Sequence, residues 1–338
     1  MFKLSGVNMS VFKDSASYRP FSYPFAMEAS QKHSIDMVWD INSIDLQDDL
    51  RQYNSKDGLK TKTSTHETNK YIIDTLTCLF TQMDMSVAGG YVELLPYIKN
   101  NEIRCWLLTA AQREVVHQRA YALLAETFGF SDSDWSAFTK YKEMRDKIDA
   151  MTDSSNIKGR DEYKAAVILS RTLIGEAVGL FGAFTCFLNY KRKGLLMGFN
   201  AVNQWSLLDE NHHVDTNIEV LAEICKDLTD KENKALSEFI KKTINLFVKT
   251  EHEFIKLVYA MGEQDDLTEK DLSDYISYLG ERLQWKLGLL QVWNVRSNPL
   301  EWMEWLLSAK RHDNFFETRV TDYTHAGLQG TVSYDRYK

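Results

Sequence analysis

Cysteine and proline are scarce in this chain of 338 residues, which contains four of each. The cysteines lie far apart and form no Cys-x-x-Cys pair, so the sequence favours neither a thiolate zinc site nor a disulfide framework. No proline occurs between Pro96 and Pro299, which removes one common reason for a helix to end there. We therefore expect a reduced, cytoplasmic protein with long helices.

The sequence also has no excess of basic residues and no long uncharged apolar run. Its 40 Lys and Arg and 48 Asp and Glu give a formal net charge of -8, which disfavours a surface for binding nucleic acid. The N-terminus has no apolar segment of the signal-peptide kind, and the longest uncharged apolar run, residues 177–188, is too short to cross a bilayer. We expect no nucleic-acid partner and no membrane partner.

Helical periodicity dominates what the sequence does contain. Apolar residues recur at spacings of three and four, and alternating strand patterns are rare. Capping residues predict helix starts at Asp161 and Asp230. We predict an all-α fold in which residues 1–30 form an extended N-terminal arm, residues 31–310 a helical domain and residues 311–338 a flexible C-terminal tail.

Two Glu-x-x-His motifs are the clearest sign of chemistry, Glu114–His117 and Glu210–His213. Residues three apart share one face of a helix, so each motif can offer an oxygen and a nitrogen to one metal ion. The alternative for either motif alone is a histidine paired on the surface. The context of the motifs decides between these interpretations.

Each motif is preceded, at a similar interval, by a lone carboxylate in an apolar stretch. Burying such an acid in its ionised form is costly without a cation, and no Lys or Arg occurs between Arg171 and Lys191. Two carboxylate helices and two Glu-x-x-His helices match the four-helix bundle of di-iron and di-manganese proteins. Four carboxylates and two imidazoles suit iron or manganese better than zinc. The predicted ligands are Asp84, Glu114, His117, Glu176, Glu210 and His213.

Tyr121 follows His117 by four residues and therefore lies on the same helical stripe as the first motif. Leu180 and Phe184 follow Glu176 along another stripe and can shield the phenol from water. A dry pocket of this kind is what a persistent tyrosyl radical requires. The alternative is an ordinary core aromatic residue.

Seven motifs in order cover nearly the whole chain: VWDINSIDLQDD, FTQMD, REVVHQRAY, GEAVGLFGAF, LLDENHH, RSNPLEWMEWL and NFFETRVTDY. With them the chain resembles the small subunit of class I ribonucleotide reductase from Trp39 to Tyr323. The resemblance implies a ferritin-like four-helix bundle with additional helices, usually assembled as a homodimer. It also implies a dinuclear metal centre that reacts with O2 to make a stable oxidant. Two iron ions are expected, with manganese or a mixed manganese–iron pair as the alternatives.

The resemblance also assigns roles to individual residues. The first three predicted ligands in chain order match one metal, the last three match the other, and Tyr121 matches the radical-bearing residue. Trp39 and Asp209 match the relay that leads to the ligand His117. Tyr323 matches the tail tyrosine that passes the oxidising equivalent to a separate large subunit, where ribonucleotides are reduced to deoxyribonucleotides.

One departure and one alternative function remain. Ser206 stands where a bulky aliphatic residue would make the pocket of Tyr121 drier, which predicts an altered radical lifetime or metal preference. The other histidines, His33 among them, have no second ligand at helical spacing, and we interpret them as surface residues or neighbours of the ligands.

The alternative function is an oxidase or monooxygenase of the same fold that acts on a small ligand. A ferritin-like iron store is disfavoured because it has no need of the relay.

Overall fold

The computed structural model describes residues 10–15, 21–136, 140–152, 157–289, 295 and 297–305. The chain divides into two units, Met1–Pro299 and Leu300–Lys338. In the second unit only residues 300–305 are described, and residues 301–305 are helical. The predicted tail, with Tyr323, lies outside the described residues.

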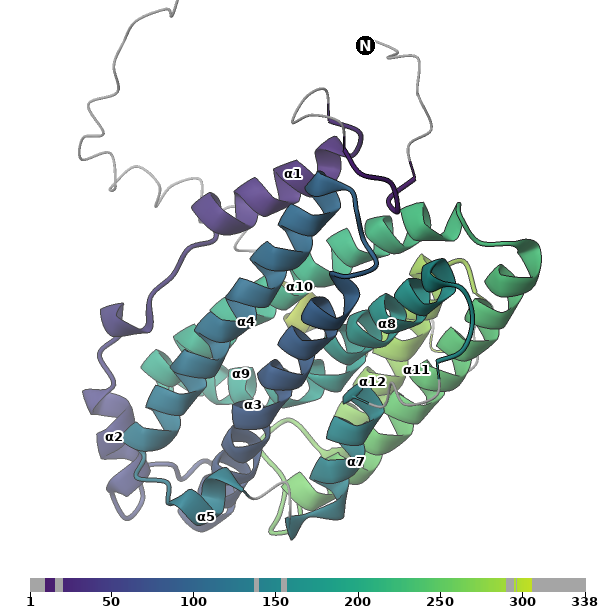
Figure 1. Ribbon diagram of the computed structural model, residues 1–338. Helices are drawn as coiled ribbons and strands as arrows, with labels where there is room; N and C mark the ends of the chain where they lie inside the picture. Colours follow the sequence, from purple (N-terminus) through teal and green to yellow (C-terminus); the bar gives the residue numbers. More distant parts are fainter. Residues whose placement is uncertain are drawn as a thin grey trace, which may run out of the picture. The chain divides into compact units, whose positions relative to one another are not determined.

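The described part of the first unit is helical and contains no β-strand, which confirms the all-α prediction. Figure 1 shows long helices packed side by side. The α-helices are α1 (Pro24–Gln31), α2 (Gln47–Asn54), α3 (His66–Leu94), α4 (Asn101–Thr127), α5 (Asp132–Trp135), α7 (Lys142–Thr152), α8 (Asp161–Ile174), α9 (Phe181–Arg192), α10 (Met197–Cys225), α11 (Asp230–Val258) and α12 (Glu269–Lys286). Shorter turns are η1 (Lys32–Asp36) and η3 (Gly175–Gly179), which are π-helical, and the 3-10 turn η2 (Ile41–Ser43).

Polar side chains cap the starts of the long helices. Thr65 accepts a hydrogen bond from the Thr68 amide at the start of α3, and Asn100 accepts one from the Ile103 amide at the start of α4. Thr229 forms a reciprocal capping box with Glu232 before α11. Each cap satisfies backbone N–H groups that have no partner within the helix. The predicted helix starts at Asp161 and Asp230 are confirmed.

Helices α3, α4, α8 and α10 form the centre of the unit. α3 packs on α4 and α8, and α10 packs on α4, α8 and α9. At Gly90 the backbone of α3 comes close to α8, since an added Cβ would lie only 2.2 Å from Oγ1 of Thr172. The predicted ligands lie on α3, α4 and α10 and on η3, the turn that directly follows α8, so this packing brings them together.

The helical stretch Asp161–Arg192 runs through this centre as α8, η3 and α9. By length and composition it could cross a membrane, but its most apolar window is entirely buried inside the protein. Its π-helical turn η3 carries Glu176, and single π turns within helices are frequent at functional sites.

The expectation of an extended arm over residues 1–30 is wrong for its last part, because α1 begins at Pro24. Proline has a preset φ that suits the first turn of a helix, and its missing N–H is not needed there. α1 buries Ala26 and Ala29 and packs on α4 and α10. The sequence following α1 is therefore held against the ligand-bearing helices.

Candidate metal centre

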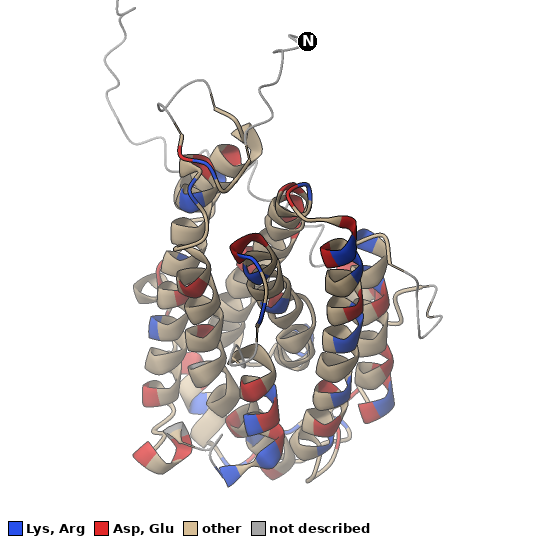
Figure 2. Cartoon of the chain, turned by 45° about the vertical axis from the view of Figure 1, so that its right-hand side comes forward, with Lys and Arg blue, Asp and Glu red and all other residues tan. Residues whose placement is uncertain are grey.

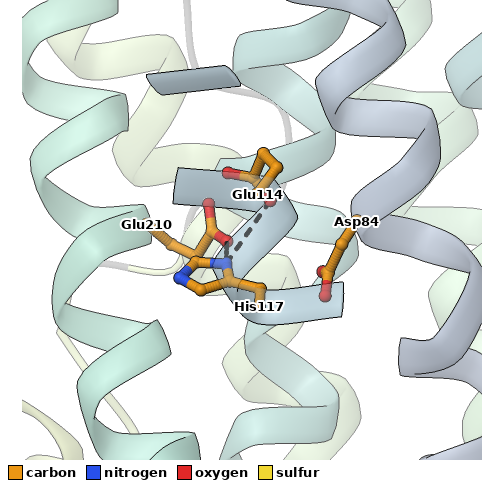
Figure 3. A group of neighbouring side chains, drawn as sticks. All are labelled: Asp84, Glu114, His117 and Glu210. Carbon is orange, nitrogen blue, oxygen red and sulfur yellow. Dashed lines mark ion pairs between the residues drawn. The ribbon is translucent and has the colours of Figure 1, made fainter. Parts of the chain in front are cut away.

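The six predicted ligands meet in one buried cluster, and each is at most 1% exposed. The cluster contains two overlapping groups whose ligand atoms lie within 4.8 Å of one another. Figure 3 shows the first group, Asp84, Glu114, His117 and Glu210, converging from three helices. The second group is Glu114, Glu176, Glu210 and His213.

Glu114 and Glu210 belong to both groups. The family resemblance divides them between two metals, whereas in the structure each of them lies close to the ligand atoms of both groups. This sharing depends on how α4 and α10 pack, so it could not be predicted from the order of the ligands in the sequence.

The two imidazoles point the same nitrogen into the cluster. Nδ1 of His117 lies 3.4 Å from Oε2 of Glu114 and 3.2 Å from Oε1 of Glu210. Nδ1 of His213 lies 3.1 Å from Oε1 of Glu114, 3.2 Å from Oε1 of Glu176 and 3.3 Å from Oε2 of Glu210. These spacings leave Nδ1 of each ring directed at carboxylate oxygens from other helices.

The inward-facing atoms of the cluster have no hydrogen-bond partners among the described residues. This holds for both carboxylate oxygens of Glu114 and Glu210, for Oδ2 of Asp84 and for Nδ1 of both histidines. Burial raises the pKa of Asp84 well above its usual value and that of Glu176 to about 7. Buried acids without partners are costly, and metal cations would satisfy both the charge and the open coordination positions. The donor set therefore fits two divalent metal ions.

Two residues that sequence reasoning missed hold Glu176 in place. Tyr91 donates a hydrogen bond from Oη to Oε1 of Glu176 at 2.6 Å, and Nδ2 of Asn217 donates to Oε2 at 3.2 Å. Asn217 also donates to Tyr91 at 2.7 Å. Tyr91 follows Asp84 by seven residues, and Asn217 follows Glu210 by seven, so each shares a helix face with a ligand. That spacing is the only signal in the sequence that points to them.

The predicted relay residues also meet. Nε1 of Trp39 donates a hydrogen bond to Oδ2 of Asp209 at 2.8 Å, and Nε2 of His117 lies 3.1 Å from the same oxygen. The rings of Trp39 and His117 are stacked, with centroids 5.7 Å apart and planes at 13°. Asp209 thus connects the indole to the ring nitrogen that points away from the cluster.

His33 and Arg113 complete the surroundings of Asp209. Nε2 of His33 lies 3.3 Å from Oδ1 of Asp209, and Nε of Arg113 lies 3.5 Å from Oδ2. Although burial favours the protonated acid, hydrogen bonds with His117 and His33 hold the pKa of Asp209 well below its usual range. His33 is fully buried, so the interpretation of it as a surface residue is wrong, while its interpretation as a neighbour of the ligands fits. The cause is α1, which places the following turn η1 against α4, so that His33 points inward while the other residues of η1 stay exposed.

Tyr121 is fully buried beside the cluster. Its ring stacks on that of Phe80 at a centroid distance of 4.6 Å. The ring of Phe184 contacts Phe80 in turn, at a centroid distance of 4.8 Å. The shielding expected from Phe184 therefore reaches the phenol through Phe80, a residue that the sequence did not single out. Oη of Tyr121 donates a hydrogen bond to Oδ1 of Asn203 at 3.0 Å.

Comparison with known proteins identifies the family. The family described as ribonucleotide reductase, small chain, matches residues 15–299. A probable ribonucleoside-diphosphate reductase small subunit from Invertebrate iridescent virus 3 is 30% identical over 344 residues, covering 95% of this chain and 88% of the viral protein.

Solved structures agree in fold. The ribonucleotide reductase R2 subunit from Clostridium botulinum has a TM-score of 0.77 at 15% identity and covers 88% of this chain and 94% of its own. Dimanganese(II)-NrdF from Streptococcus sanguinis has a TM-score of 0.70 at 13% identity, with coverages of 85% and 96%. The chain shares their ferritin-like helical fold. It belongs to the ribonucleotide reductase small-chain family, the small subunits of the oxidoreductase ribonucleoside-diphosphate reductase.

Proposed function

We propose that this chain is the radical-generating small subunit of a class I ribonucleoside-diphosphate reductase, in which Tyr121 carries the radical. The observation that supports this most is the placement of His117. Its Nδ1 faces the carboxylate cluster, and its Nε2 faces the pair formed by Asp209 and Trp39. One ring thus contacts both the candidate metal centre and the candidate relay.

The six ligands would hold two metal ions, with Glu114 and Glu210 shared between them. When bound, such ions supply the one-electron chemistry that uses O2 to oxidise a tyrosine. We expect two iron ions, with manganese or a mixed pair as alternatives, because carboxylate and imidazole ligands accept both metals. Manganese stays among the alternatives because NrdF from Streptococcus sanguinis, which has the same fold, is a dimanganese(II) protein.

The remaining residues orient and shield the centre. Tyr91 and Asn217 orient the carboxylate of Glu176, and Phe80 covers one face of the Tyr121 ring. Asp209 accepts the Trp39 N–H bond and fixes the outward nitrogen of His117. In this proposal Trp39, Asp209 and His117 transmit the oxidising equivalent, and Tyr323 carries it to the large subunit.

The buried position of the cluster favours this function over direct oxidation of a small ligand. A cavity of about 740 Å³ lies along α7 and α11, lined by residues such as Lys142, Asp146 and Thr243. Its lining includes none of the six ligands and not Tyr121. A buried centre that exports an oxidising equivalent needs no substrate pocket of its own.

A second copy of the chain is the proposed partner for an apolar face on α3 and α4. Met85 and Val92 on α3, and Leu108 and Val115 on α4, are each more than half exposed. In each pair the two residues are seven apart and share a helix face. No exposed position is charged between residues 82 and 92 or between 105 and 118. Exposed apolar faces of this kind mark protein interfaces, and we propose a homodimer.

The same proposal includes a cytoplasmic location and no nucleic-acid or membrane partner. None of the four cysteines forms a disulfide, which fits a reducing compartment. Acidic and basic residues are interspersed along several helices (Figure 2), so charges of one sign do not gather there as they do on nucleic-acid-binding faces.

Turnover with the large subunit tests the proposal. The metal-loaded chain should support ribonucleoside-diphosphate reduction only when the class I large subunit of the same source is added. Tyr323→Phe should leave the metal content and the Tyr121 radical unchanged and abolish turnover. Substrate oxidation by the isolated chain, or full turnover by Tyr323→Phe, would contradict the proposal.

A further inference from the structure

The phenol of Tyr121 lies between an aromatic ring and a polar part of α10. Phe80 covers the ring, while the hydroxyl donates to Oδ1 of Asn203 at 3.0 Å. Asn203 is fully buried, so no water competes for this bond at the protein surface. A pocket built only to exclude polar groups would not place an amide at this position.

The orientation of the Asn203 amide is fixed by a second hydrogen bond. Its Nδ2 donates to the backbone oxygen of Phe199 at 3.0 Å, one turn earlier in α10. Turning the amide over would lose this bond and place N–H against O–H, so Oδ1 is the atom that faces Tyr121. An amide oxygen accepts a hydrogen bond but is far too weak a base to take the phenolic proton.

Ser206 follows Asn203 by three residues and shares its face of α10. It is fully buried, and its Oγ has no hydrogen-bond partner among the described residues. The hydroxyl lies within reach of the phenol but forms no hydrogen bond of good geometry with it: burial and the Asp84 carboxylate raise the pKa of Tyr121 well above its usual value, and a weak hydrogen bond from Ser206 opposes them. A buried hydroxyl without a partner carries an energetic cost, so an unused donor beside this phenol calls for an explanation.

We propose that Asn203 and Ser206 are positioning residues for the two oxidation states of Tyr121. Asn203 accepts the hydrogen bond of the reduced phenol, and the Ser206 hydroxyl donates to the phenoxyl oxygen after oxidation. This inference rests on the proposed function, since it takes Tyr121 as the radical site.

The chemistry of the phenol explains why two partners are needed. Oxidation converts Tyr–OH into Tyr–O• with loss of one electron and one proton. Dioxygen, which takes up four electrons and four protons on reduction to two water molecules, is the acceptor of both. Two bound metal ions would supply two of the other three electrons and an external reductant the third, and the remaining three protons come from solvent. The phenoxyl oxygen has no hydrogen left to donate, so Oδ1 of Asn203 then faces it as a second acceptor. Ser206 supplies the O–H that the radical can accept.

The reduced state can be tested in the metal-free protein by infrared spectroscopy with ring-labelled tyrosine, using Tyr121→Phe to identify the band of this phenol. Asn203→Leu, which keeps a similar volume without an acceptor, should shift the C–O band of Tyr121. Ser206→Ala should leave the band in place. The reverse pattern would overturn the assignment of Asn203.

The oxidised state can be tested by high-field electron paramagnetic resonance and proton hyperfine measurements after metal loading and exposure to O2. The radical should show one exchangeable proton that disappears in D2O and in Ser206→Ala but is retained in Ser206→Thr and Asn203→Leu. We expect the radical half-life of Ser206→Ala to fall about two- to tenfold, the range for loss of one hydrogen bond.

Two outcomes overturn parts of the inference separately. A tyrosyl radical without an exchangeable proton, or one whose proton survives in Ser206→Ala, would exclude Ser206 as the donor. A protein that forms no tyrosyl signal would contradict the proposed function and, with it, the role of Ser206. The infrared result decides the role of Asn203 in either case.

Discussion

The carboxylates on the two sides of the His117 ring differ in whether protein groups balance their charge. On the side of Nδ1, both carboxylate oxygens of Glu114 and of Glu210 have no hydrogen-bond partner among the described residues. On the side of Nε2, Asp209 is surrounded by Trp39, His33 and Arg113 as well as His117 itself. On the Nε2 side, neighbouring protein groups neutralise the charge of Asp209. On the Nδ1 side, the carboxylates need an added cation to balance their charge. Metal should therefore change the behaviour of the first side and leave that of the second unchanged.

The largest effect on stability is expected from Asp209→Leu. Removing this carboxylate leaves Arg113 buried without its anion and Trp39 without its acceptor. Loss of one partner from such a network typically lowers the free energy of unfolding by about 3–5 kcal/mol. Denaturant unfolding of the metal-free protein measures it. Asp48→Ala, which removes an exposed acid paired with Arg51, is the control and should leave the midpoint unchanged. Equal effects of the two variants would contradict the comparison.

The pH dependence of the metal-free protein should come next. Burial raises the pKa of Glu176 from 4.5 to about 7, so the folded state keeps this proton to a higher pH than the unfolded state. The folded state then binds more protons across this window, and stability should fall by about 3 kcal/mol as pH rises from about 4.5 to about 7.

Unfolding midpoints between these two pH values, with and without metal, check this dependence. In the metal-free protein, Glu176→Gln should remove the part of the fall in stability that comes from the Glu176 carboxyl. In the metal-loaded protein the slope should reverse, because protons and the cation compete for the same carboxylates. An identical slope in both forms would mean that the carboxylates are not metal ligands.

A smaller effect is expected from Glu114→Gln. Without metal, the Glu114 carboxylate lies 3.4 Å from Nδ1 of His117 and 3.1 Å from Nδ1 of His213. Although burial raises its pKa, the two imidazoles lower it overall, so removing the charge should lower the free energy of unfolding by about 1–3 kcal/mol. With metal, it should reduce the content of both ions, because Glu114 belongs to both ligand groups. Calorimetry of the metal-free protein measures the change in stability, and metal analysis measures the content of both ions. Glu126→Gln, an exposed acid on the same helix, serves as the control. Metal content unchanged from that of the control would exclude the shared role.

The smallest effect is expected from Tyr91→Phe, which keeps the ring and removes the hydrogen bond that the hydroxyl donates to Glu176 and the one that it accepts from Asn217. Asn217 keeps its hydrogen bond to Glu176, so we expect a loss of stability of about 1 kcal/mol. Residues that orient a metal ligand also affect the metal affinity, and we expect the variant to bind metal about tenfold more weakly. Competition with a chelator measures the affinity. Unchanged affinity would show that Glu176 is oriented without Tyr91.

The sequence predicts well the features whose cause is local. Four of the six clustered residues could be found because Glu-x-x-His spacing places two side chains on one helix face, whatever the rest of the chain does. Helix starts at Asp161 and Asp230 could be found because caps act within a few residues. The lone acids in apolar stretches could be found because burial without a cation is costly.

Features that depend on packing between distant segments could not be predicted. Arg113 donates to the backbone oxygens of His33 and Met37, and this contact exists only because α1 and η1 fold back onto α4. The sharing of Glu114 and Glu210 likewise requires the relative placement of two helices. Asn203 precedes Glu210 by seven residues and shares its helix face, but this spacing alone does not show that the amide faces Tyr121.

The most direct test of the account is electron paramagnetic resonance on metal-free protein loaded anaerobically with Fe(II) and then exposed to O2, with bound metal counted. We expect two metal ions per chain and a tyrosyl signal that is absent from Tyr121→Phe at unchanged metal content. A signal that persists in Tyr121→Phe, or a protein that binds two ions and forms no tyrosyl radical, would contradict the assignment of Tyr121 as the oxidised residue.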